Sequence, residues 1–177
     1  MILWSVARTS AFVAFAAYTF VIAWGMLIAA KVARPAAPAV AAHRFLSSLG
    51  LVAIATHVTA LLLDGYANVT PRMLVGLDSR PSLIAGSIGM WLCVALPLSF
   101  RLRKAKWISQ RVWRGFHWLG YVVWALALGH GIASGSDTGS AFAMAAYAGA
   151  AGVVLLASLY RVGARRSRRP AAFPATR

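Results

Sequence analysis

Residues 113–133 read WRGFHWLGYVVWALALGHGIA, an apolar run that contains two histidines, His117 and His130. Its uncharged part, residues 115–133, is close to the roughly 20 residues that a helix needs to cross a bilayer. An ionisable side chain inside such a segment is energetically costly and is usually functional. The stretch therefore predicts a transmembrane helix that carries two functional histidines.

Four further apolar segments of similar length accompany this one, and the composition points to a membrane protein. Of the 177 residues, 60% are hydrophobic and 12% are charged, whereas soluble domains carry about 25% charged residues. The predicted fold class is all-α, a polytopic transmembrane helical bundle of about five helices in one domain at residues 1–160. The apolar segments lie at residues 11–30, 43–63, 83–100, 115–133 and 141–160.

Two basic segments lie outside these predicted helices. Residues 161–177 combine basic and small residues with two prolines, and such a composition cannot build a core, which predicts a disordered cytoplasmic tail. Residues 101–112 are basic with large apolar residues interspersed. This linker either lies along the inner membrane surface or forms a solvated turn, and both interpretations stay open.

The distribution of charge predicts how the bundle is oriented. The chain has 18 Lys and Arg against 3 Asp and Glu, a formal net charge of +15. Basic residues follow the first, third and fifth apolar segments, and the acidic residues lie in the other two loops. Because cytoplasmic loops carry the excess of Lys and Arg, we expect the N-terminus outside and the C-terminus in the cytoplasm. The expected location is a plasma membrane, the inner membrane of a bacterium.

The positive charge makes membrane lipid an expected partner. Basic residues near the membrane contact the anionic headgroups of the cytoplasmic leaflet. Binding of nucleic acid is not expected, because the basic residues cluster between apolar runs rather than along a groove with interleaved aromatic side chains.

All four histidines of the chain fall in two of the predicted helices. His43 and His57 are 14 positions apart, and His117 and His130 are 13 apart, so each pair spans about 20 Å at 1.5 Å per residue. Two crossings separate the helices, which therefore run parallel. This arrangement puts His43 level with His117 on the cytoplasmic side and His57 level with His130 on the outer side.

Each level then has the geometry of a bis-histidine haem site. A neutral imidazole donates a lone pair to iron, and two imidazoles fill both axial positions, which suits electron transfer rather than oxygen binding. The sequence predicts two haem b groups, with the four histidines as iron ligands and no catalytic residue. A histidine that only makes an interhelical hydrogen bond is the alternative at each position.

Two details of the predicted sites leave alternatives open. At 3.6 residues per turn, the 13-residue offset leaves His117 and His130 about 140° apart around their helix. That helix must therefore tilt, bend or present its ligands from two flanks. Arg44 and Arg114, beside the cytoplasmic-level ligands, are either partners of haem propionates or charges at the membrane edge.

Two residues midway between the levels also have two interpretations. Gly50 lies between His43 and His57, where it makes room either for a macrocycle or for close helix packing. Trp124 lies between His117 and His130, where it either sits between the haems or packs against another helix.

Three motifs around the histidines resemble those of one known family. They are WRGFHWLGY at residues 113–121 followed by His130-Gly131, then His43-Arg44 with His57, and Arg8-Thr9-Ser10-Ala11. Over roughly residues 8–160 they resemble the ferric reductase-like transmembrane domain family. That family includes ferric reductases, NADPH oxidases and the haem subunit of the bacterial periplasmic methionine sulfoxide reductase system. The resemblance implies one haem b at each level and electron entry from the cytoplasm, although many members have six helices.

The predicted function is transmembrane electron transfer from a cytoplasmic-side donor to an outer-side acceptor. No flavin or NADPH domain is expected after the fifth helix, and no Gly-rich dinucleotide fingerprint occurs. The chain is thus expected to be the haem-binding membrane subunit of an oxidoreductase, with a separate reductase, a quinol or a flavin carrier as donor. A flavin would be bound only through such a partner. Ferric iron, oxygen, quinone or an outer-side redox protein is the expected acceptor.

Two other functions stay open. A cytochrome b subunit that exchanges electrons with quinol uses similar histidine spacings. A non-redox membrane transporter or structural membrane protein belongs to a different class. Divalent cations usually need charge compensation inside a membrane, and no Asp or Glu lies inside a predicted helix, which favours haem over cation transport.

Overall fold

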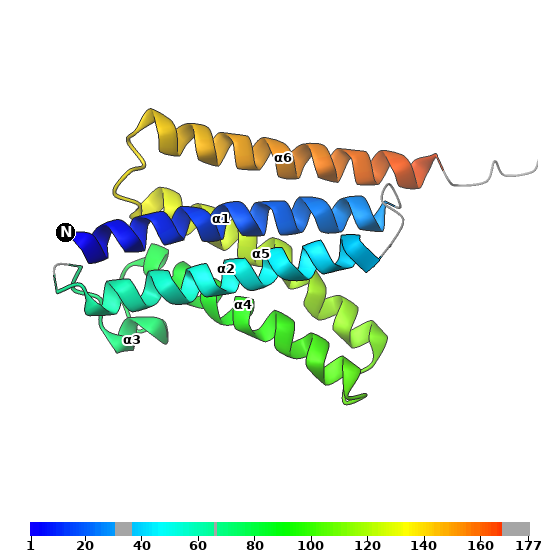
Figure 1. Ribbon diagram of the computed structural model, residues 1–177, viewed down its shortest axis with the longest axis horizontal. Helices are drawn as coiled ribbons and strands as arrows, with labels where there is room; N and C mark the ends of the chain where they lie inside the picture. The colour runs from blue at the N-terminus through cyan, green and yellow to red at the C-terminus, as the bar shows by residue number, and fades with distance from the viewer. Residues whose placement is uncertain (31–36, 66, 168–177) are drawn as a thin grey trace, which may run out of the picture.

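The computed structural model describes residues 1–30, 37–65 and 67–167, apart from the side chain of Arg165. Within these residues the chain is all-α (Figure 1), which confirms the predicted fold class. Five of the helices are long and apolar enough to span a membrane, so this is a multi-pass transmembrane helical protein. The helices are α1 (Ile2–Ala29), α2 (Ala37–Leu63), α3 (Pro71–Leu74), α4 (Pro81–Lys104), α5 (Gln110–Ser134) and α6 (Ala141–Arg166).

Local sequence explains where the helices begin. Pro81 starts α4, a position at which its missing N–H removes no helical hydrogen bond. Ser109 and Ser140 cap α5 and α6, because their hydroxyl oxygens accept hydrogen bonds from the backbone N–H groups of Val112 (3.2 Å) and Ala143 (3.1 Å). The four-residue α3, which also starts on a proline, was not predicted because it is too short to show a periodic pattern.

The long helices extend beyond the apolar segments that predicted them. The α1 helix begins at Ile2 rather than residue 11, and α6 continues to Arg166 rather than ending at residue 160. The prediction counted apolar residues, whereas a helix also continues through the polar headgroup region. Arg161 therefore belongs to α6 and not to a tail. Residues 168–177 of the predicted tail lie outside the described residues.

The basic linker predicted at residues 101–112 is much shorter in the structure. The α4 helix continues to Lys104 and α5 starts at Gln110, so only residues 105–109 connect them. Five residues are too few for a helix along the membrane surface, so the structure has a short turn at this position. The basic residues between α1 and α2, Lys31 and Arg34, lie outside the described residues.

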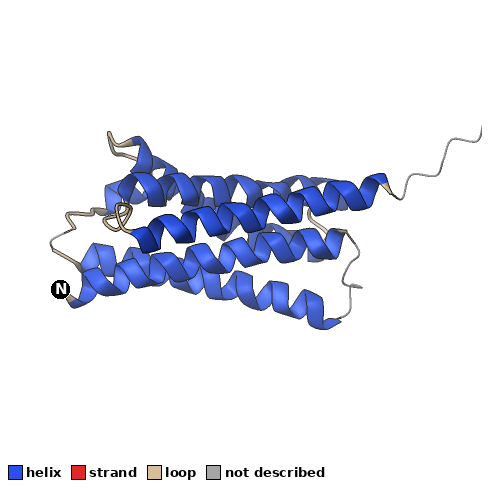
Figure 2. Cartoon of the chain, turned by 90° about the horizontal axis from the view of Figure 1, so that it is seen from above, coloured by secondary structure: helices blue, strands red, loops and turns tan. Residues whose placement is uncertain are grey.

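Four of the five long helices form two closely packed pairs. The α1 helix packs along α2, and α4 packs along α5, whereas contact between α2 and α4 is slight. The α6 helix covers the side of α1 opposite α2 (Figure 1). Seen at right angles, the long helices run alongside one another with their connections at the two ends (Figure 2). The α2 and α5 helices run in the same direction, as the alternation of crossings requires.

Gly50 and Trp124, midway along the bundle, both serve helix packing. A Cβ atom on Gly50 would lie 2.8 Å from Cε2 of Tyr18, so the glycine makes room for this α1 ring. The space beside Gly50 is therefore filled by Tyr18, which supports the interpretation that this glycine serves close helix packing. The indole N–H of Trp124 donates to Oγ1 of Thr19 (3.0 Å), and its ring stacks on Phe15, with centroids 6.1 Å apart.

The two ends of the bundle differ in charge. All three acidic residues of the sequence, Asp64, Asp78 and Asp137, lie at one end, which we call the acidic end. The opposite end carries the basic α4–α5 turn and the end of α6, and we call it the basic end. At the acidic end Arg8 of α1 forms an ion pair with Asp137 of the α5–α6 connection. This pairing neutralises the one basic residue of α1.

Candidate functional site

His43 and His117 face each other near the basic end. They lie on α2 and α5, and their ring centroids are 6.0 Å apart with an angle of 55° between the ring planes. Trp113 stacks on His117, with centroids 5.1 Å apart and a ring angle of 26°. On the α1 side, a Cβ atom on Gly25 would lie 3.3 Å from Cε1 of His43. The structure thus brings together the first pair of histidines that the sequence predicted.

His57 and His130, toward the acidic end, are each fixed by a backbone carbonyl. Nδ1 of His57 lies 2.8 Å from the carbonyl oxygen of Ala7 on α1, and Nδ1 of His130 lies 2.8 Å from that of Ser82 on α4. A carbonyl oxygen only accepts, so Nδ1 must be the donor in both rings. The neutral tautomer therefore leaves Nε2 of each ring with a free lone pair.

These two rings share one cavity. Both line a space of about 570 Å³ between α1, α2, α4 and α5. This volume is within the 300–1,000 Å³ of ordinary ligand sites. The wall next to His130 is Gly86 of α4, where a Cβ atom would lie only 2.8 Å from Nδ1 of the ring.

The α5 helix presents its two histidines on different flanks. His117 meets α2 through His43, whereas His130 lies against Gly86 and bonds to Ser82, both on α4. The helix runs without a break from Gln110 to Ser134. Of the three ways to accommodate the 13-residue spacing, presentation from two flanks is the one supported by these contacts.

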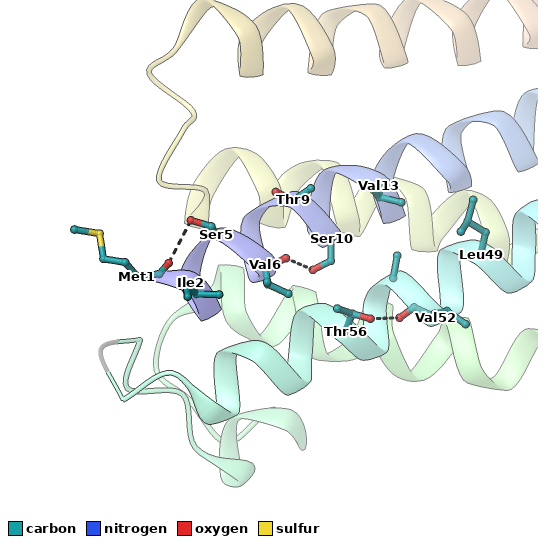
Figure 3. Close-up of a pocket in the computed structure, with 11 residues that line it drawn as sticks. Met1, Ile2, Ser5, Val6, Thr9, Ser10, Val13, Leu49, Val52 and Thr56 are labelled. Atoms are coloured by element: carbon teal, nitrogen blue, oxygen red, sulfur yellow. Dashed lines mark hydrogen bonds between the residues drawn. The ribbon is translucent and has the colours of Figure 1, made fainter.

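A second hollow lies on the outside of the α1–α2 pair and contains no histidine. It measures about 660 Å³ and is lined by residues such as Val6, Val13 and Leu49 (Figure 3). The hydroxyls of Ser5, Ser10 and Thr56 in its wall donate to carbonyl oxygens of their own helices. This surface is apolar, as expected where a transmembrane helix pair meets lipid.

The spacing of one histidine pair fits the axial positions of a haem. Metal–imidazole bonds are about 2.0–2.1 Å long, so two imidazoles on opposite sides of one metal have ring centres roughly 6 Å apart. The 6.0 Å between His43 and His117 agrees with this spacing. At the other pair, the Nδ1–carbonyl bonds are the outer contacts that usually orient metal-binding histidines. No group of three or more His, Cys, Asp or Glu side chains comes together in the described residues.

Arg44 and Arg114, the sequence-predicted propionate partners, both lie exposed at the basic end. Their predicted role stays a prediction. The structure instead directs two other arginines inward. The guanidinium carbon of Arg103 lies 4.7 Å from the Trp113 ring centre, and Arg161 donates from Nη1 to the hydroxyl of Tyr121 (2.7 Å).

Sequence reasoning missed Arg161 because it follows the last apolar run. The helical repeat contained the signal. Ala157, one turn earlier, is buried in a cluster with Ala23 and Met26 of α1, and residues four apart share a helix face. Arg161 therefore lies on the inward face of α6.

Comparison with known proteins adds no assignment: no family model, no curated protein and no solved structure matches this chain. The resemblance to the ferric reductase-like family rests on the motifs quoted above, and the site rests on its own geometry.

Proposed function

We propose that this protein carries electrons across a membrane through two haem b groups, each held by two histidines. The observation that carries the proposal is the arrangement of the four rings in two pairs, one toward each end of the bundle. His43 faces His117 at 6.0 Å, and His57 shares a cavity with His130. Two imidazoles at one level match the two axial positions that a haem iron leaves to the protein.

In this function the protein orients the histidines that would bind the iron, and it keeps small molecules such as oxygen away from the iron. The carbonyls of Ala7 and Ser82 hold His57 and His130 in the tautomer that offers Nε2 to a metal. If two histidines held each haem, no position on the iron would be left for oxygen or other small ligands. The haem iron would supply a reversible one-electron change, with its reduction potential set by the axial ligands and by nearby charge.

The separation of the pairs along the bundle supports transfer across the membrane. Fourteen positions separate His43 from His57 on α2, which is about 21 Å along a helix. This covers most of the roughly 30 Å hydrocarbon core. Two redox groups at these depths divide the membrane into short steps that an electron can cross.

We further propose the direction from the charge distribution. The basic end faces the cytoplasm by the positive-inside rule, and electrons enter there at the His43–His117 level from a separate reductase, a flavin carrier or a quinol. They leave at the His57–His130 level to an acceptor outside. In this proposal the protein is the haem subunit of an oxidoreductase in a bacterial inner membrane.

Absorbance spectroscopy tests the proposal directly. The full chain, purified in detergent after expression with adequate haem, should show low-spin b-type bands that sharpen on reduction with dithionite. Haem extraction should give two haems per chain. A preparation that is folded by circular dichroism but has no b-type absorbance would contradict the proposal.

A further inference from the structure

Arg161 occupies an unusual position at the basic end. Although it lies close to the end of α6, its side chain turns back toward α5. Nη1 donates to the hydroxyl of Tyr121 (2.7 Å), and the guanidinium carbon lies 4.9 Å from the Trp118 ring centre. Its Nε atom is buried and has no hydrogen-bond partner among the residues that the structure describes. One donor of this cation is thus held inside the protein without an acceptor.

No acidic side chain is placed to neutralise Arg161. The sequence has only three, Asp64, Asp78 and Asp137, and all lie at the acidic end. Two of these already pair with the arginines Arg8 and Arg80. A partly buried charge without an opposite charge is costly, so an anion from outside the chain is expected beside Arg161.

The position of Arg161 relative to the histidines indicates which anion this is. Tyr121, its hydrogen-bond partner, follows His117 by one helical turn on α5. Trp118, whose ring lies under the guanidinium, is the residue directly after His117. The guanidinium of Arg161 therefore lies over the turn of α5 that contains and follows this histidine.

We propose that Arg161 binds a propionate carboxylate of the haem held by His43 and His117, with Tyr121 orienting the guanidinium. This inference rests on the proposed function. A lipid phosphate offers the same anionic oxygen chemistry, but the burial of Nε and the contacts of the guanidinium with the α5 turn after His117 favour a carboxylate that enters with the haem. Arg161 is then a positioning residue that also favours the reduced, more negative state of this haem.

The test is a redox titration of the Arg161→Gln variant, with Arg166→Gln as the control. Arg166 lies on the same helix end but is exposed, so its replacement removes the same charge from a solvated position. We expect Arg161→Gln to lower the reduction potential of the basic-end haem by about 59 mV, which is a tenfold decrease in the equilibrium constant for its one-electron reduction. The other haem should not change, and Arg166→Gln should leave both haems unchanged. Repetition in the His130→Ala background identifies the affected haem.

Two further arms keep the outcome decisive. If Arg161→Gln does not fold, Arg161→Lys and Tyr121→Phe should still give smaller shifts of the same sign. The titrations are run in nanodiscs of phosphatidylcholine and of phosphatidylglycerol. A shift seen only with the anionic lipid assigns the site to lipid phosphate and overturns the proposal, as do unchanged potentials in every Arg161 variant. A wild-type protein without haem contradicts the proposed function instead, so the two failures are distinguishable.

Discussion

The two histidine pairs are held by different means. Near the acidic end, His57 and His130 each donate from Nδ1 to a backbone carbonyl, so the backbone fixes the rings before any ligand binds. Near the basic end, the ring of His43 lies against the backbone of Val21 on α1, but its buried Nδ1 makes no hydrogen bond of ordinary geometry, and His117 stacks on Trp113. The His57–His130 pair is preorganised by hydrogen bonds, whereas the His43–His117 pair depends more on aromatic contacts.

The charges at the two ends follow the same division. At the acidic end, Arg8 pairs with Asp137 and Arg80 with Asp78, so these two arginines are neutralised within the chain. At the basic end, Arg103 packs on aromatic rings and Arg161 bonds to a phenol. The basic end is therefore where we propose that an anionic ligand binds, whereas two arginines of the acidic end are paired within the chain.

Removal of single histidines should have the largest effect and tests whether the two pairs are independent. We expect His43→Ala and His117→Ala to lose the same haem, and His57→Ala and His130→Ala to lose the other, because each haem needs both axial ligands. Haem content should fall from two per chain to about one, measured by haem extraction and redox titration.

Trp124→Phe is the control for this series. Trp124 lies between the levels in sequence, but its contacts are with Thr19 and Phe15, so both haems should remain. A result in which His43→Ala and His130→Ala lose the same haem would contradict the pairing by level.

A methyl group at Gly86 should disturb the acidic-end pair. A Cβ atom there would lie 2.8 Å from Nδ1 of His130, and overpacking of this kind costs about 1–3 kcal/mol. Because His130 is already fixed by its carbonyl bond, the ring cannot move away without losing that bond. We expect Gly86→Ala to lower occupancy of the His57–His130 haem and the melting temperature, measured by absorbance and thermal unfolding.

Two other glycines calibrate this effect. A Cβ atom on Gly89 would make an ordinary contact at 3.6 Å with Leu126, so Gly89→Ala should be nearly neutral. Gly25→Ala should fall between, because its Cβ atom would lie 3.3 Å from His43, a ring without a fixed partner that can shift. Equal losses in Gly86→Ala and Gly25→Ala would show that the two pairs are held equally rigidly.

Trp113→Leu tests the stacking that holds the basic-end pair. Aromatic pairs contribute about 0.5–1.5 kcal/mol beyond burial, so haem release from the His43–His117 level should accelerate roughly 2- to 12-fold. Haem transfer to apomyoglobin measures this rate. Trp107→Leu is the control, since Trp107 is 78% exposed in the α4–α5 turn. Equal acceleration in both variants would mean that the stack on His117 has no specific role.

The sequence predicted the levels of the histidines because parallel helices and a fixed rise per residue leave little freedom. It did not predict how the rings are held. The partners of His57 and His130 are backbone carbonyls of Ala7 and Ser82, and every residue has a carbonyl, so no side-chain pattern marks them. The packing role of Gly50 depends on the ring of Tyr18, which is 32 positions earlier in the sequence. This contact forms only when α1 packs on α2.

The pattern of apolar residues also could not predict where the helices end. Arg8 lies within α1 because Asp137 neutralises it across the bundle, and Arg161 lies within α6 because Tyr121 and Trp118 accept its guanidinium. Hydropathy scores both arginines as membrane-edge charges. Only tertiary partners tell which basic residue faces inward, so proximity in sequence to the histidines indicated Arg44 and Arg114 and not Arg161.

The smallest expected effect concerns the charge pair at the start of α4. The backbone N–H and the side-chain Nε of Arg80 donate to Oδ1 of Asp78 (2.7 and 3.0 Å). These hydrogen bonds hold the pKa of Asp78 below its ordinary value of 3.8. A carboxylate with a lowered pKa in the folded state stabilises the fold fully above its unfolded-state pKa. That contribution is lost as the pH falls through the folded-state pKa.

Thermal unfolding of Asp78→Asn against wild type from pH 7 to pH 3 measures this contribution. The difference in melting temperature should be small and constant down to about pH 5 and should shrink at lower pH. Arg80→Gln should give the same profile, and the double variant should add little, because both single changes remove one interaction. A difference that persists unchanged at pH 3 would mean that Asp78 acts as a neutral turn residue. The acidic end would then be held by its backbone bonds and not by its charge pairs.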